Sequence, residues 1–236
     1  MKTWDINKHS VILRDEFELL RDSEECKMKY SYCEKLMWLA MNGVIFELLK
    51  EKTPDVDCKQ WKKKSKERYK QIISELDEIG DMMKNPLRVS LSGGAVWMAV
   101  YETAPNKMSE KLFSEMVTAT MGAPIIKKAF SGKNPFSLDY QKKKAEKDKI
   151  ANGMSSSPYN WVTETIPGRD GDEYTTIYRQ CGLCELGRKL GHSELVPYMC
   201  QMDYISVDMM GRSWMSSSHI SRLVSYSVVD LSRIHL

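Results

Sequence analysis

The residues best suited to chemistry gather in one short segment, where Cys181, Cys184 and Cys200 fall within twenty positions. Asp203 follows Cys200 by three residues and Tyr204 by four, so on a helix all three side chains lie on one face. A thiolate is a strong nucleophile, and a carboxyl group beside it can activate water or carry a proton. The alternative is a buried cysteine beside a surface aspartate, with no chemistry.

The first two cysteines form a Cys-x-x-Cys motif, which is typical of half a zinc site or of a redox pair. For zinc, Cys181, Cys184 and Cys200 would supply three ligands, and His192 or His219 could complete a tetrahedron. A redox pair is expected at the start of a helix that follows a strand, which the pattern around Cys181 provides. Plain structural packing is the third interpretation, and the spacing leaves all three open.

The predicted secondary structure around these residues differs from one part of the chain to the next. Apolar residues at three- and four-residue steps predict a helical part over residues 1–130, beginning with a helix from Val11 to Lys50. A charged connector follows over residues 131–159, and an α+β part carries the cysteines over residues 160–236. The three stretches could also pack as one compact domain.

The part that carries the cysteines is predicted to be a small antiparallel sheet with two helices. WVTETI and EYTTIYR flank a turn at Asp170-Gly171 and predict a β-hairpin. A helix is expected from Cys181 to Leu190 and another from Glu194 to Met210, with a terminal strand in LVSYSVVDLSRI. Upstream, the Gly93-Gly94 pair in a buried helix would allow close approach of another helix or a ligand. The fold class predicted for the whole chain is α+β.

Composition excludes several classes of protein. The chain of 236 residues is 42% hydrophobic and 28% charged with a net charge of +3, which predicts a globular protein and no nucleic-acid partner. No segment reaches the roughly 18 to 20 apolar residues that span a bilayer, so no membrane partner is expected. The first residues lack the apolar stretch of a secretory signal, which favours a cytoplasmic location with cysteines as thiols.

A longer stretch carries a resemblance to a known family. CGLCELGRKLGHSELVPYMCQMDYISVDMMG strongly resembles the signature of the L-2-amino-thiazoline-4-carboxylic acid hydrolase family, and LSGGAVWMAVYETAP is similar to the helical part of that family. The positions that match the signature are Cys181, Gly182, Cys184, Leu186, Gly191, Glu194, Leu195, Pro197, Cys200, Asp203 and Tyr204.

The resemblance implies hydrolytic opening of a small cyclic amidine such as a thiazoline ring, toward a carbamoyl-cysteine product. Under it, Cys200 is the candidate nucleophile and Asp203 the proton shuttle. The candidate substrate-binding residues are Cys181, Cys184, His192, Tyr204 and Arg179, with Arg188 and Arg212 as further cations for a substrate carboxylate. The partner is a small-molecule substrate, no cofactor is expected, and the oligomeric state is not predicted.

The end of the chain departs from the family pattern, which closes on an Arg-Thr-x-Thr-Leu segment, a glycine turn and a Cys-Asp-Phe strand. Asp230 stands at the aspartate of that strand, but Val229 replaces the cysteine and Leu231 the phenylalanine. A different substrate, or a member that binds a small molecule without turnover, is therefore an alternative to the hydrolase. The other alternative is a structural zinc or thiol redox module.

Overall fold

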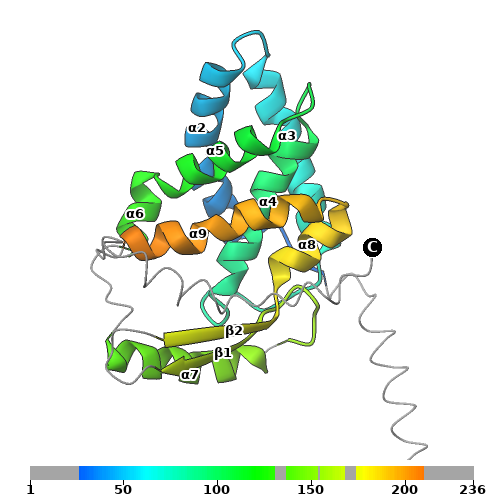
Figure 1. The fold of residues 1–236 in the computed structure, drawn as a ribbon. Helices are drawn as coiled ribbons and strands as arrows, with labels where there is room; N and C mark the ends of the chain where they lie inside the picture. The colour runs from blue at the N-terminus through cyan, green and yellow to red at the C-terminus, as the bar shows by residue number, and fades with distance from the viewer. Residues whose placement is uncertain (1–26, 131–136, 154, 168–173, 210–236) are drawn as a thin grey trace, which may run out of the picture.

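The computed structural model describes residues 27–130, 137–153, 155–167 and 174–209 (Figure 1). Helices and one hairpin follow in the order α2 (Tyr32–Lys52), α3 (Cys58–Glu75), α4 (Leu87–Glu102), α5 (Glu110–Met121), α6 (Pro124–Phe130), α7 (Leu138–Asn152), β1 (Val162–Pro167), β2 (Tyr174–Gln180), α8 (Gly182–Leu190), the 3₁₀ turn η2 (Ser193–Leu195) and α9 (Val196–Met209). The predicted α+β fold class is confirmed. None of the helices in the described ranges is both long and apolar enough to cross a membrane.

Polar caps decide where several helices begin. Glu34 accepts hydrogen bonds from both the backbone N–H and the hydroxyl of Ser31, so α2 begins at Tyr32 and the predicted helix does not run unbroken from Val11. Asp57 accepts from the first backbone N–H groups of α3. Ser109 accepts from the N–H of Leu112 and so caps the start of α5.

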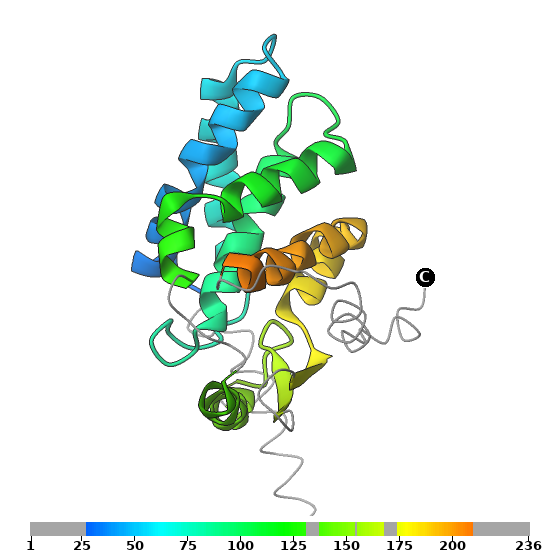
Figure 2. The same cartoon turned by 60° about the vertical axis from the view of Figure 1, so that its left-hand side comes forward.

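Helix α4 is the centre of the hydrophobic core, and every residue from Leu91 to Val100 is buried. It packs against α2 and α3 on one side and against α8 on the other (Figure 2). The predicted close approach at the double glycine is confirmed, because a β-carbon on Gly94 would lie 2.3 Å from Cδ2 of Leu183 in α8. Gly94 thereby lets α8 lie directly on α4.

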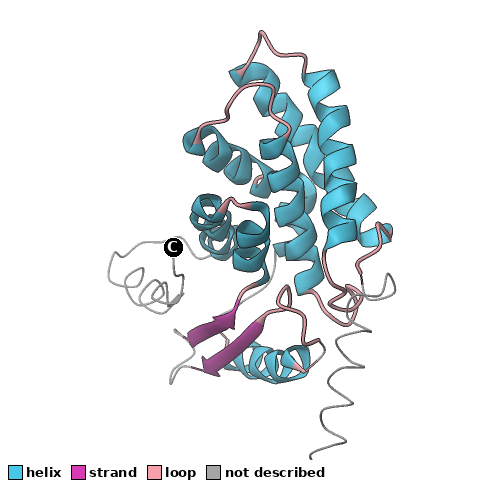
Figure 3. Cartoon of the chain, turned by 90° about the vertical axis from the view of Figure 1, so that its right-hand side faces the viewer, coloured by secondary structure: helices cyan, strands magenta, loops and turns pink. Residues whose placement is uncertain are grey.

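The charged segment of the predicted connector forms α7, and α7 packs along β1 at one end of the helical part (Figure 3). Asn152 donates to the carbonyl of Thr163 and accepts from its N–H, and Lys144 donates to the hydroxyl of Thr165 at 2.7 Å. The strands pair antiparallel, with Thr165 opposite Thr176. The predicted turn at Asp170-Gly171 and the terminal strand lie outside the described residues, as do Val229 and Leu231.

One hydrophobic core runs across the predicted division of the chain. It includes Ile45, Trp97 and Phe113 from the helical part together with Trp161 and Leu186 from the part that follows. The hairpin end is also tied to the helices through polar side chains. Asn85, buried before α4, donates to the side-chain oxygen of Asn160 at 2.9 Å. The described part of the chain therefore packs around a shared interior.

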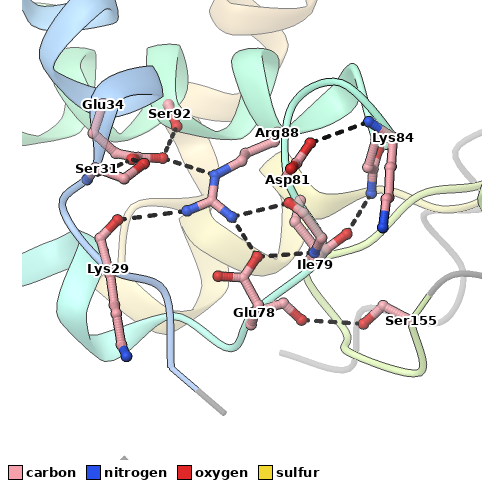
Figure 4. A network of polar contacts seen from close by, with 12 residues as sticks. Lys29, Ser31, Glu34, Glu78, Ile79, Asp81, Lys84, Arg88, Ser92 and Ser155 are labelled. Atoms are coloured by element: carbon pink, nitrogen blue, oxygen red, sulfur yellow. Dashed lines mark hydrogen bonds and ion pairs between the residues drawn. The ribbon is translucent and has the colours of Figure 1, made fainter. Parts of the chain in front are cut away.

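A buried ion pair fixes the entry to α2 against the start of α4 (Figure 4). The Arg88 guanidinium donates to Glu34 at 2.9 Å, and it also contacts Glu78 and the carbonyl of Gly80. Ser92 donates to the same Glu34 oxygen at 3.2 Å. Burial opposes ionisation, but hydrogen bonds from Ser31 and Arg88 outweigh it and lower the pKa of Glu34.

Candidate active site

The candidate site begins where β2 ends and α8 starts. Cys181 is the N-cap residue of α8, directly after Gln180, whose side chain donates to the carbonyls of Ser157 and Asn160. Gly182 follows, and a β-carbon there would lie 2.1 Å from the Tyr159 carbonyl oxygen. Only glycine leaves room for this contact, so the Cys-Gly sequence fixes the start of α8 against the segment before the hairpin.

Cys181 and Cys184 both lie at the first turn of α8. A hydrogen bond from Cys184 is the largest influence on Cys181; it outweighs burial and, with help from the backbone N–H groups of Leu183 and Cys184, lowers the pKa of Cys181 to about 7. The Cys181 thiol makes no capping hydrogen bond to the start of α8. The backbone N–H groups of Leu183 and Cys184 therefore stabilise its thiolate through their partial positive charge. The same contact with Cys181 strongly raises the pKa of Cys184. The pair therefore holds one proton firmly and gives up the other near neutral pH.

Cys200 and Asp203 project from α9. Burial raises the pKa of Cys200 to about 12, and the charges of Cys181 and Asp203 act in the same direction. Asp203 is exposed to solvent, yet surrounding protein atoms limit its hydration enough to raise its pKa to about 6, while Lys144 acts to lower it. A carboxyl group of this pKa exchanges a proton readily near neutral pH.

The four predicted chemical groups form one electrostatic cluster. The Asp203 charge raises the pKa of Cys181, and Cys200 and Cys181 both raise that of Cys184. Such mutual effects require the groups to be close, because charge–charge interactions weaken with distance. The four groups therefore lie within range of one another's charges, and the hydrogen bond from Cys184 lowers the pKa of Cys181 while burial raises that of Cys200.

His192 does not join this cluster. It follows the far end of α8, and the nine residues of that helix separate it from Cys181 by about 13 Å. There it lies in a hollow of about 500 Å³ that Arg68, Tyr101 and Lys107 also line. Its imidazole is 3.7 Å from the Glu102 carboxylate, and its ring packs edge-on against Tyr101. The expected contact with a substrate held at the cysteines is therefore not supported.

Arg179 and Tyr204 occupy surface positions. The Arg179 guanidinium donates to Glu164 across the hairpin at 2.9 Å, with both side chains largely exposed, so this cation is already paired. Arg188 is likewise exposed and paired, with Glu185. Tyr204 is 39% exposed on α9, next to Asp203. Their roles in substrate binding stay predictions.

The cation that acts on the cluster is Lys144, which the sequence did not single out. It projects from α7, where it donates to Thr165 at 2.7 Å and to Asp148 at 3.2 Å. Its positive charge lowers the pKa of Asp203. In the sequence it is one lysine among many in QKKKAEKDK, and no local signal separates it from its solvated neighbours.

Metal binding at the cysteines would need a different arrangement of the described side chains. Across residues 27–130, 137–153, 155–167 and 174–209, no three His, Cys, Asp or Glu side chains are grouped so that they could hold an ion. All five cysteines in these ranges are free thiols: Cys33, Cys58, Cys181, Cys184 and Cys200.

Fold and site together define an α+β protein in which two adjacent helices carry three thiols and one carboxyl group with a raised pKa. The family model for L-2-amino-thiazoline-4-carboxylic acid hydrolase matches residues 88–222, which is more than half of the chain. The chain belongs to this family. The match includes α4, the hairpin and both cysteine helices, while α2 and α3 precede it. Neither the curated proteins nor the solved structures contain a significant match.

Proposed function

We propose that the protein is a hydrolase that opens a small cyclic amidine, a thiazoline-like ring, at its C=N carbon. The observation that carries the proposal is the lowered pKa of the Cys181 thiol, about 7. This thiol also lies within range of the charge of Asp203, the proposed proton carrier. At pH 7 about half of such a thiol is ionised, against about 3% of a cysteine with an ordinary pKa near 8.5.

The nucleophile in this proposal is Cys181 in place of the predicted Cys200. Its thiolate adds to the C=N carbon, the ring bond to the departing heteroatom breaks, and that atom takes a proton. Water then attacks the carbon attached to the sulfur and releases Cys181. The protonated Asp203 carboxyl gives its proton to the departing ring atom, and the carboxylate so formed takes a proton from the attacking water, which suits a group with a pKa near 6. No cofactor is needed for these steps.

Replacing each thiol separately tests the assignment. Cys181→Ser should lower kcat on a 2-aminothiazoline carboxylate at least a thousandfold, because a serine hydroxyl is not ionised near neutral pH. Cys200→Ser is the matched control, since it changes one sulfur of the same cluster, and it should keep kcat within about tenfold. The measurement is steady-state turnover, with circular dichroism to verify folding.

A large loss of kcat in Cys200→Ser with little loss in Cys181→Ser would identify Cys200 as the nucleophile. Equal loss in both variants would indicate that the three thiols act as one structural unit. Metal analysis of the reduced protein tests the zinc alternative independently, because stoichiometric zinc on Cys181, Cys184 and Cys200 would leave no thiolate for attack.

A further inference from the structure

Two thiols at the start of α8 are arranged for more than one kind of chemistry. Cys181 is the N-cap residue of α8 and Cys184 lies in the first turn of that helix, so the two side chains are one helical turn apart, and neither is fully buried. The rigid contact of Gly182 with Tyr159 holds the first cysteine at the head of the helix. A bond between the two sulfurs would therefore link two side chains at the same turn of one helix.

We propose that Cys181 and Cys184 are a site of reversible oxidation, at which a peroxide closes the pair into a disulfide. The proposal goes beyond hydrolysis, and only its effect on turnover rests on the proposed function. When the disulfide is closed, Cys181 no longer offers a free sulfur, so ring opening stops. Reduction by a thiol restores it.

The oxidation proceeds in two balanced steps. The Cys181 thiolate attacks one oxygen of hydrogen peroxide, the O–O bond breaks, and the departing hydroxide takes a proton to give water and a sulfenic acid. The Cys184 sulfur then attacks the Cys181 sulfur, the S–O bond breaks, and the second oxygen leaves as water with the Cys184 proton. Two thiols and one peroxide yield one disulfide and two waters.

The surroundings favour this pair over other pairings in the described part of the chain. Cys33 is buried in α2, and Cys58 lies at the start of α3 without a second cysteine beside it in the helix. Cys200 projects from a different helix, α9, whereas Cys184 shares the first turn of α8 with Cys181. Cys184 is therefore expected to react first with an oxidised Cys181.

The test treats the full-length reduced protein with stoichiometric hydrogen peroxide and maps its peptides by mass spectrometry. The expected product has lost two hydrogens, links Cys181 to Cys184, and is reversed by dithiothreitol. In Cys184→Ser, a sulfenic acid should accumulate on Cys181 and be trapped by dimedone, while Cys181→Ser should give no link. Cys200→Ser, the matched control, should still form the disulfide at a rate within about threefold of the unsubstituted protein.

The pH dependence supplies a second readout that does not need a substrate. Between pH 6 and pH 8 the oxidation rate should rise only about tenfold, whereas a thiol of ordinary pKa would rise roughly 75-fold. A link from Cys181 to Cys200, or oxidation of Cys58 while the pair stays reduced, would overturn the proposal. A disulfide that forms in a protein without turnover would support this site and contradict the hydrolase. Full turnover by the disulfide form would overturn the regulatory effect.

Discussion

At the scale of single residues, the proposed chemistry depends on which of three thiols and one carboxyl group are protonated near neutral pH. Cys181 gives up its proton because Cys184 donates a hydrogen bond to it and the first turn of α8 supplies backbone N–H groups. Cys200 keeps its proton because it is desolvated and faces the negative charges of Cys181 and Asp203. Proximity alone does not assign a nucleophile; the balance of hydrogen bonds and burial does.

Removing the Asp203 charge should change both the thiol and the turnover. Because that charge raises the pKa of Cys181, Asp203→Asn should shift the midpoint of Cys181 alkylation by iodoacetamide to a pH below 7. Turnover should fall by about 10²- to 10⁴-fold through loss of the proton carrier. Asp139→Asn, which removes an exposed carboxylate of α7, should change neither quantity. An unchanged midpoint in Asp203→Asn would show that the carboxyl lies too far from the thiol to act on it.

At the scale of elements, the site depends on how closely α8 approaches its neighbours. Leu183 and Leu186 of α8 fill the space that Gly94 leaves on α4, and Met199 of α9 reaches the same place. The head of α8 rests on the segment before β1 through Gly182. Glycines at these two contacts let α8 approach both α4 and the segment before β1 closely.

Adding one methyl group at the head of α8 should be costly. Gly182→Ala would place a β-carbon 2.1 Å from a backbone oxygen, so we expect a loss of about 1–3 kcal/mol in the free energy of unfolding, together with weaker thiol reactivity. Gly43→Ala is the matched control, because Gly43 lies within α2 with nothing within 4 Å of the added carbon. It should stabilise the protein by up to about 1 kcal/mol. Urea unfolding measures both, and equal effects would contradict the steric argument.

At the scale of the whole molecule, buried polar groups connect segments that are far apart in the sequence. Glu34 and Arg88 are almost completely buried, and each has its hydrogen bonds satisfied (Figure 4). Asn85 and Asn160 connect the start of α4 to the base of the hairpin. These contacts join the first helices to the part that carries the thiols.

Breaking the buried ion pair should destabilise the fold strongly. Arg88→Met would leave the Glu34 carboxylate buried without its cation, at a cost of about 3–5 kcal/mol. Arg179→Met breaks an exposed pair of the same type and should cost about 1 kcal/mol or less. Because the pKa of Glu34 is lowered in the fold, its stabilisation is present above about pH 4 and is lost as the pH falls further. Urea unfolding at pH 7 and pH 3 should show the difference between the variants shrink in acid.

Local patterns were sufficient for much of this protein. The sequence predicted the α+β class, the hairpin, the two cysteine helices and the close approach at Gly93-Gly94, because periodicity and spacing act over a few residues. Tertiary structure decided what depends on distant neighbours. It turned the charged segment into a helix on β1, brought Lys144 toward Asp203, and placed His192 at the other end of α8. It also made Cys181 the acidic thiol, since burial and hydrogen bonding set a pKa and neither can be read from the order of residues.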